Sequence, residues 1–101
     1  MTIKEVKQSG NNVTVKYENN TRVINNVTLI GNTSNAVFVV SSGKIVTVYV
    51  EQGGNLVATC ARINLASNAI AKVCGNTLEI KNGNTRHIYD EKGQNIKTIC
   101  G

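Results

Sequence analysis

Three cysteines and one histidine are the residues of this chain that could bind a soft metal ion: Cys60, Cys74, Cys100 and His87. Together they have the donor count of a Cys3His zinc site. Zinc sites of that kind usually contain a Cys-x2-Cys pair, whose two thiolates chelate the metal from one turn, and the chain has no such pair. We therefore predict that the protein binds no metal.

The same residues could supply a nucleophile, because a base beside a cysteine activates its thiol. Cys74 or Cys100 with His87 would form such a pair and make the chain a small enzyme. No nucleophile motif surrounds them, and the glycines form neither a G-x-G-x-x-G pattern nor a Walker loop. We therefore predict no catalytic residue and no cofactor, and we interpret His87 as a solvent-facing strand residue. The carboxylates that could orient a base are few: Glu5, Glu18, Glu51, Glu79, Asp90 and Glu91.

An internal repeat indicates the architecture more directly than any single residue does. Residues 34–60 align with residues 74–100 at a constant offset of 40 positions and without a gap. Self-similarity at a fixed period is typical of repeat folds, so we expect the two segments to have superimposable backbones. A third, weaker copy begins at Gly10. The identical pairs are Gly43 with Gly83, Tyr49 with Tyr89, Glu51 with Glu91, Gly53 with Gly93, Asn55 with Asn95 and Cys60 with Cys100.

Two of these pairs suggest structural roles. Cys60 and Cys100 end equivalent units, which favours small hydrophobic side chains in one layer of the core. A disulfide between them requires the two ends to converge, and it would not persist in a reducing cytosol. Tyr49 and Tyr89 close equivalent strands, and we expect them to cover the core with the hydroxyl reaching solvent.

Composition and alternation both predict an all-β chain. Valine and isoleucine number 23 against 4 leucines, and β-branched side chains pack well on a pleated sheet. Asn82-Gly83 lies between two alternating runs, which is the strongest short-range signal of a type I′ hairpin. Residues 51–54 and 90–93 then form the second turn of each unit. Each good copy is therefore expected to be a three-stranded meander with one tight turn and one four-residue turn.

Residues 61–73 allow two interpretations. Ile63, Ala66, Ile70 and Val73 would share one face of a helix, whereas apolar alternation fits two strands that break at residues 67–68. Asparagine is a poor helix former, so we favour the strands and keep one short helix near 61–73 as the alternative. The predicted fold is thus all-β, with tandem three-stranded meander repeats in a single β-repeat domain over residues 1–101. Its shape would be a small sandwich, an open barrel or a triangular prism.

The formal net charge of +5 raises the question of an acidic partner. The charge is spread thinly along the chain, without the basic stripe and interleaved aromatic residues that are usual in nucleic-acid-binding modules. A fold could nevertheless gather Arg22, Arg62, Lys72 and Arg86 on one face. Nucleic-acid binding through these four residues is therefore the alternative hypothesis for function.

The first residues contain no apolar leader and no cleavage site, and no apolar run approaches the ~18 residues of a membrane span. We therefore expect a soluble cytoplasmic protein that does not bind a membrane. An export signal removed ahead of Met1 would change this interpretation.

The C-terminal unit resembles a known kind of repeat. Residues 88–99, preceded by Gly75-Asn76-Thr77 and by residues 82–85, are similar to the tandem β-meander pattern of short bacterial and prophage proteins. The likeness covers residues 74–100 well, residues 34–60 partly and the first third of the chain poorly. It implies a bacterial or phage origin and no catalytic activity, and it assigns no functional residue.

A non-catalytic binding or assembly protein is the function that these observations favour. Meander units of this size cannot bury their apolar faces alone, so they must pack on one another or on another chain. The chain has no proline, which is one of the usual devices that block pairing at a sheet edge. A protein partner or self-association is therefore expected, and a two-fold homodimer is the commonest outcome. If the sheets close on themselves instead, no edge remains and the chain stays monomeric.

Overall fold

Strands make up most of the chain and follow one another in sequence order. The structure is a computed structural model that describes residues 3–17, 20–41, 44–53, 55–66 and 68–100, without the side chains of residues 60 and 61. The described residues contain no helix. Their strands are β1 (Ile3–Ser9), β2 (Asn12–Tyr17), β3 (Thr21–Asn25), β4 (Val27–Asn32), β5 (Ala36–Ser41), β6 (Ile45–Gln52), β7 (Asn55–Asn64), β8 (Ile70–Cys74), β9 (Thr77–Asn82), β10 (Thr85–Tyr89) and β11 (Asn95–Cys100).

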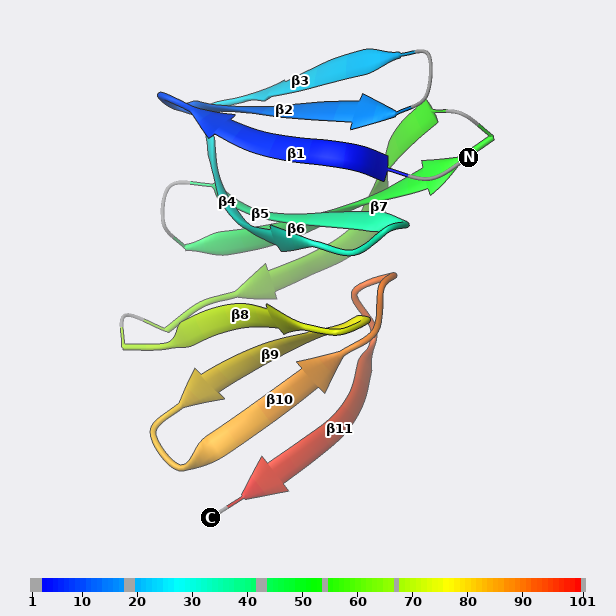
Figure 1. Ribbon diagram of the computed structural model, residues 1–101. Helices are drawn as coiled ribbons and strands as arrows, with labels where there is room; N and C mark the ends of the chain where they lie inside the picture. The colour runs from blue at the N-terminus through cyan, green and yellow to red at the C-terminus, as the bar shows by residue number, and fades with distance from the viewer. Residues whose placement is uncertain (1–2, 18–19, 42–43, 54, 67, 101) are drawn as a thin grey trace.

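Neighbouring strands pair in antiparallel fashion and form three separate sheets. Sheet A contains β1–β3, sheet B contains β4–β7 and sheet C contains β8–β11. The sheets are stacked with sheet B in the middle (Figure 1). Each sheet is open in the described part of the chain, because its first and last strands pair on one side only. The predicted all-β meander is confirmed, and its shape is a sandwich extended to three layers.

The ambiguous residues 61–73 belong to strands. β7 runs to Asn64 and β8 begins at Ile70, as the apolar alternation indicated. β8 pairs with β9 and becomes the first strand of sheet C, and β4 has the same place in sheet B. Each predicted three-stranded unit is therefore completed by a fourth strand on its N-terminal side.

Glycine-asparagine turns close the first hairpin of sheet A and two hairpins of sheet C. Their glycines have a positive φ, of 60° at Gly10, 58° at Gly75 and 62° at Gly83, and the asparagine after each of them does not. Positive φ at the first turn position alone is typical of type II′ turns. The type I′ turn expected at Asn82-Gly83 is therefore wrong: the two turn residues are Gly83 and Asn84, one position later.

The repeat is visible in the pairing of sheets B and C, with a slip of one residue. Tyr49 and Tyr89 occupy equivalent places in β6 and β10, as the sequence offset predicts. Tyr49 pairs with Val37 on the preceding strand, and Tyr89 pairs with Leu78. Val37 and Leu78 are 41 positions apart in the sequence, one more than the offset of 40 that relates the two copies. The slip arises because the turn before β10 is one residue shorter than the turn before β6. The pairs that close these turns are Ser41–Ile45 in sheet B and Asn82–Thr85 in sheet C.

The second turn of each unit differs more. Gln52 pairs directly with Asn55 in sheet B, whereas Tyr89 pairs with Asn95 in sheet C. The predicted four-residue turn is thus shorter in one sheet and longer in the other. The two units share their order of strands, but their turns do not superimpose. The longer turn, residues 90–94, extends toward sheet B.

Sheet B is buried on both faces, so the hydrophobic core has two halves. In β5, Val37 and Val39 face sheet A, whereas Ala36 and Phe38 face sheet C, and all four are fully buried. A strand that is covered on both faces has no side exposed to solvent, which explains why apolar residues occupy consecutive positions in β5.

The members of the two halves come from all three sheets. Tyr49 is half-buried against the first half and Tyr89 against the second, which fits the prediction that they cover the core. The half between sheets A and B contains Ile3, Val13, Val15, Tyr17, Ile24, Val27, Val37, Val39 and Leu56. The half between sheets B and C contains Ala36, Phe38, Val46, Val48, Ile63, Leu78 and Ile80.

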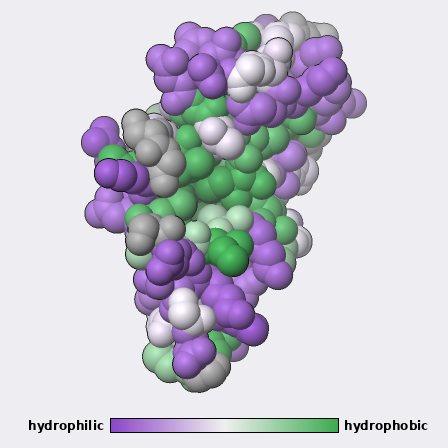
Figure 2. Space-filling model, turned by 90° about the vertical axis from the view of Figure 1, so that its left-hand side faces the viewer, coloured by the Kyte–Doolittle hydropathy of each residue, from purple (hydrophilic) through white to green (hydrophobic). Residues whose placement is uncertain are grey.

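Polar residues cover both ends of the stack. Figure 2 shows one side of the molecule, where hydrophobic residues gather over the middle and hydrophilic residues over the two ends. In sheet A, Lys7 and Lys16 lie on the outer face, whereas Val13 and Val15 are buried on the opposite face. Terminal units with a polar outer face are what ends a stack of repeats. Sheets A and C therefore act as caps on sheet B.

Candidate functional site

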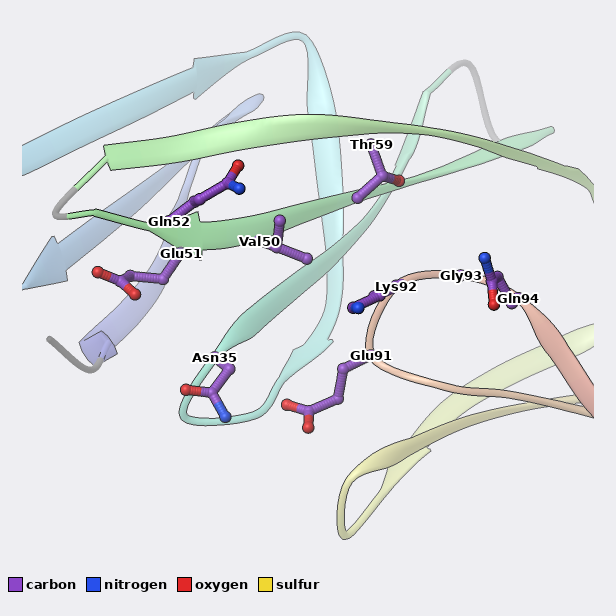
Figure 3. Close-up of a pocket in the computed structure, with 9 residues that line it drawn as sticks. All are labelled: Asn35, Val50, Glu51, Gln52, Thr59, Glu91, Lys92, Gly93 and Gln94. Carbon is purple, nitrogen blue, oxygen red and sulfur yellow. The ribbon is translucent and has the colours of Figure 1, made fainter.

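A cleft opens where the β10–β11 turn of sheet C approaches sheet B (Figure 3). Its volume of about 750 Å³ lies in the range of small-ligand pockets. Three parts of the fold line it: the β4–β5 turn, the end of β6 with one residue of β7, and the β10–β11 turn. The lining residues are Asn35, Val50, Glu51, Gln52, Thr59, Glu91, Lys92, Gly93 and Gln94.

Thr33 joins the β10–β11 turn to sheet B. Its side chain is buried, and its Oγ1 accepts hydrogen bonds from the backbone N–H groups of Asn35 at 3.1 Å and Ala36 at 3.0 Å. The hydroxyl donates its own proton to Oε2 of Glu91. A hydroxyl can donate one hydrogen bond and accept two, so the hydrogen-bonding capacity of the Thr33 hydroxyl is fully used. Glu91 is thereby fixed in the wall of the cleft.

Asp90 shapes the β10–β11 turn from within. Its Oδ1 accepts hydrogen bonds from the backbone N–H groups of Lys92 and Gln94, both at 2.9 Å. Gly93 has a φ of 83°, a conformation that glycine adopts without strain. Aspartate is favoured in turns because its side chain can bond to the backbone in this way. Local interactions therefore hold Lys92 and Gln94 at the mouth of the cleft.

The end of β6 forms the other wall. The backbone N–H of Glu51 donates to the carbonyl oxygen of Asn35 at 2.8 Å, which ties β6 to the β4–β5 turn. In Figure 3, Glu91 points toward Asn35 and Glu51 lies farther from the β10–β11 turn. The repeat-equivalent residues Glu51 and Glu91 thus line one cleft. Their alignment at equivalent turns did not predict that they would meet at one site.

Amide and carboxylate groups determine what this cleft can hold. The side-chain amides of Asn35, Gln52 and Gln94 can each donate and accept hydrogen bonds. The charges of Glu91 and Lys92 offset each other, whereas Glu51 pairs with Leu56 and therefore lies on the side of sheet B that faces sheet A. None of the described residues that line it is a cysteine or a histidine. The cleft therefore suits a polar ligand whose groups both donate and accept hydrogen bonds.

The described residues considered for metal or nucleophile chemistry do not form one cluster, although strand pairing makes His87 and Cys100 diagonal neighbours on one face of sheet C. Cys74 and Cys100 are at the ends of β8 and β11, the two edge strands of sheet C. The solvent-facing position expected for His87 is wrong: it is half-buried on β10 and pairs with the core residue Ile80, so it lies on the side of sheet C that faces sheet B. Its Nδ1 lies 3.3 Å from Oγ1 of Thr98. Across residues 3–100, apart from the gaps given above, no three His, Cys, Asp or Glu side chains are grouped closely enough to hold a metal ion.

The expected core position of Cys100 is wrong. Its side chain is exposed and its thiol is free, so it does not form the disulfide considered for it. The reason is its place on β11, where most side chains are exposed because this edge strand lies away from sheet B (Figure 1). The core position predicted for the Cys60 side chain falls outside the described residues.

The four basic residues considered for nucleic-acid binding do not share one face. Arg22 lies on β3 and donates from Nη1 to the carbonyl oxygen of Leu56 at 2.8 Å, so it connects sheet A to sheet B. Arg62 is exposed on β7 of sheet B. Only Lys72 and Arg86 lie together, on sheet C.

Lys72 and Arg86 flank Glu79 on the outer face of sheet C. The Nζ of Lys72 and the Nε of Arg86 each lie 3.7 Å from a carboxylate oxygen of Glu79. Lys81 and Lys97 belong to the same face, and neither was among the residues predicted from the sequence. Alternation in β9 could have placed Lys81 beside Glu79, but the position of Lys97 depends on the pairing of β10 with β11.

The comparisons with known proteins add no relative. No family model, no curated protein and no solved structure matches the chain. The described residues also include no helix that could cross a membrane. The function must therefore be inferred from the geometry of the chain itself.

Proposed function

We propose that the chain is a non-catalytic binding protein of bacterial or phage origin that acts in the cytoplasm. In this proposal, the cleft between sheet B and the β10–β11 turn holds a short segment of a protein partner. The observation that carries the proposal is the cleft itself, whose walls come from two sheets and are fixed by the hydrogen bond between Thr33 and Glu91.

A peptide is the ligand that best fits the lining of this cleft. Peptide groups need both donors and acceptors, and the amides of Asn35, Gln52 and Gln94 supply both. The half-buried Val50 adds an apolar contact for an aliphatic side chain.

The absence of catalysis is part of the proposal. A general acid or base must lie within hydrogen-bond reach of the group on which it acts. The histidine and the two described thiols of the chain are not among the residues that line the cleft. One of the two glutamates is already bonded to Thr33, which gives it a structural part in the wall.

Selection from a phage-displayed library of random peptides tests this function. The bound peptides should share a sequence motif, and their affinity should fall at least severalfold for Gln52→Ala/Gln94→Ala. The double variant Asn25→Ala/Asn64→Ala is the control, because it removes two exposed amides that do not line the cleft. Peptides that bind both variants equally well, or a selection that enriches no peptide, would contradict the proposal.

Assembly of two copies is a second candidate. Its basis is β11, an edge strand on which five of the six side chains are exposed. Unpaired backbone groups at such an edge can pair with the edge of a second copy.

A further inference from the structure

Four cations lie on the outer face of sheet C, the face turned away from sheet B. In an antiparallel sheet, directly paired residues point to the same side. Pairing across the four strands places Lys81 beside Arg86 in one row, and Lys72, Glu79 and Lys97 in the next. The opposite side of the same strands carries the buried core residues Leu78 and Ile80. We call the set of Lys72, Lys81, Arg86 and Lys97 the basic face.

The basic face keeps most of its charge. Its only carboxylate is Glu79, whose side chain is 16% exposed and contacts both Lys72 and Arg86. Within the described residues, Lys81 and Lys97 have no ion-pair partner. Four cations and one carboxylate leave a net charge of +3, more than half of the +5 of the whole chain.

The other end of the stack provides the comparison. The outer face of sheet A carries Lys7, Lys16 and Glu5, with Lys16 Nζ at 3.9 Å from Glu5 Oε2. These three residues sum to +1, and the exposed Lys4 lies at the bulge between Ile3 and Glu5, where strand pairing assigns no face. The two caps are both polar, and the cap formed by sheet C carries the larger positive charge. Covering the core does not require this difference, because either charge sign would keep an outer face polar.

We propose that the basic face binds the phosphate backbone of a nucleic-acid duplex without reading its sequence. This surface lies outside the cleft, so the proposal does not depend on the function assigned to the cleft. Adjacent strands are about 4.8 Å apart, so Lys72 and Lys97 on the two outer strands are separated by roughly 14 Å. Cations spread over that width can contact several phosphates at once, which is the main source of affinity in non-specific binding.

A duplex fits this face better than a single strand does. Proteins that bind single strands combine positive charge with aromatic side chains on which the bases stack. The two rows contain isoleucines beside the charged residues and no aromatic residue: Ile70, Ile88 and Ile99. A duplex has the higher density of phosphate charge and requires no contact to a base.

The salt dependence of duplex binding is the first test. A fluorescently labelled DNA duplex is titrated with the protein, and its anisotropy is followed between about 50 mM and about 200 mM salt. Four phosphate contacts predict that the affinity falls roughly a hundredfold over this range. No measurable binding at about 50 mM salt would overturn the proposal, and so would an affinity that does not change with salt.

A matched pair of variants locates the surface. Lys81→Gln/Lys97→Gln removes the two cations that have no ion-pair partner, and the same change in salt should then weaken binding only about tenfold. Lys7→Gln/Lys16→Gln removes the same charge from the opposite cap and should leave the salt dependence close to that of the original chain. Equal losses in the two variants would show that net charge, and not the basic face, is responsible, and would overturn the proposal.

Glu79→Gln tests the proposal in the opposite direction. The substitution keeps the shape of the side chain and frees Lys72 and Arg86, so duplex affinity at about 50 mM salt should rise severalfold. Unchanged affinity in a folded variant, judged by circular dichroism, would count against the basic face.

Competitors identify the class of ligand. Duplex DNA should displace the labelled duplex more effectively than a single strand of the same length, poly-glutamate or vesicles rich in phosphatidylserine do. Stronger displacement by the single strand, by the acidic polypeptide or by the vesicles would overturn the assignment to a duplex.

Discussion

Individual polar side chains, in addition to the apolar core, connect sheet A to sheet B. Gln8 on β1 accepts a hydrogen bond from the backbone N–H of Leu29 at 2.6 Å and donates to the carbonyl oxygen of Val27 at 3.1 Å. Arg22 makes the corresponding contact from β3 to β7. These bonds satisfy backbone groups on β4 and β7, the edge strands of sheet B. Because an unsatisfied backbone group costs about 1–3 kcal/mol when buried, these side chains have a structural role.

Tyr17 gives the protein a defined response to alkaline pH. Burial raises the pKa of its hydroxyl above the ordinary value of about 10, and the nearby charge of Arg22 and a hydrogen bond to the backbone of Leu56 only partly offset this effect. Above that pH the unfolded chain loses the proton while the folded chain keeps it. Its contribution to stability is therefore complete below about pH 10 and is lost as the pH rises through the folded pKa.

We expect the free energy of unfolding to fall more steeply between about pH 9 and about pH 11 in the original chain than in Tyr17→Phe. Urea denaturation at a series of pH values measures both slopes. The substitution also removes a hydrogen bond, which lowers stability at every pH, so the comparison rests on the slope. Parallel curves for the two proteins would show that Tyr17 ionises normally.

At the scale of the strands, β4 and β8 approach each other so closely that a Cβ at one position would clash. A Cβ on Gly31 would lie 2.7 Å from Cγ2 of Val73, which is inside van der Waals contact. The close approach occurs beside a register shift in β4, between Leu29 and Gly31. The side chain of Val73 thus fills the space that a side chain at position 31 would occupy and helps to join sheet B to sheet C.

We expect Gly31→Ala to destabilise the fold by about 1–3 kcal/mol, the usual cost of overpacking. In Gly31→Ala/Val73→Ala, the loss should be smaller than the sum of the two single losses, because the second change removes the clash. Thermal or urea unfolding of the four proteins in this cycle gives the coupling energy. Strict additivity would mean that the two residues do not press on each other.

Strands could be predicted from the sequence, whereas turns and register could not. Apolar alternation identified the strands on both sides of residues 67–68, and the repeat indicated that two sheets share one order of strands. One residue more or less in a turn leaves alternation within each strand unchanged. The slip between β5 and β9 and the type II′ turn at Gly83 were therefore invisible until the pairs were known.

The cleft and the basic face were missed for a related reason. Asn35, Gln52 and Gln94 come from three separate turns or strand ends, and they meet only because sheet C stacks on sheet B. Lys97 joins Lys72 through the pairing of four strands. Neither arrangement leaves a local pattern in the sequence, since each depends on contacts between distant segments.

The whole molecule is a stack with finished ends and open sides. Sheet B supplies a core on both faces, and the polar outer faces of sheets A and C prevent further sheets from adding to the stack. A monomer was the expectation for sheets that close on themselves. That condition is not met, because every sheet keeps two edge strands in the described part of the chain. The edges differ, however. Side chains of sheet A contact the backbone of both edge strands of sheet B, whereas β11 is exposed along most of its length.

We expect two copies to associate through β11, with Ile96, whose side chain is 57% exposed, buried at the junction. Sedimentation equilibrium should then give a mass that rises with concentration from 10.8 kDa toward twice that value. Ile96→Lys should shift the equilibrium to the monomer, because a lysine on an edge strand opposes pairing. Val23→Lys introduces the same charge at an exposed residue of β3 and should leave the association unchanged. A mass of 10.8 kDa at every concentration would exclude the dimer and leave β11 as an edge for some other chain.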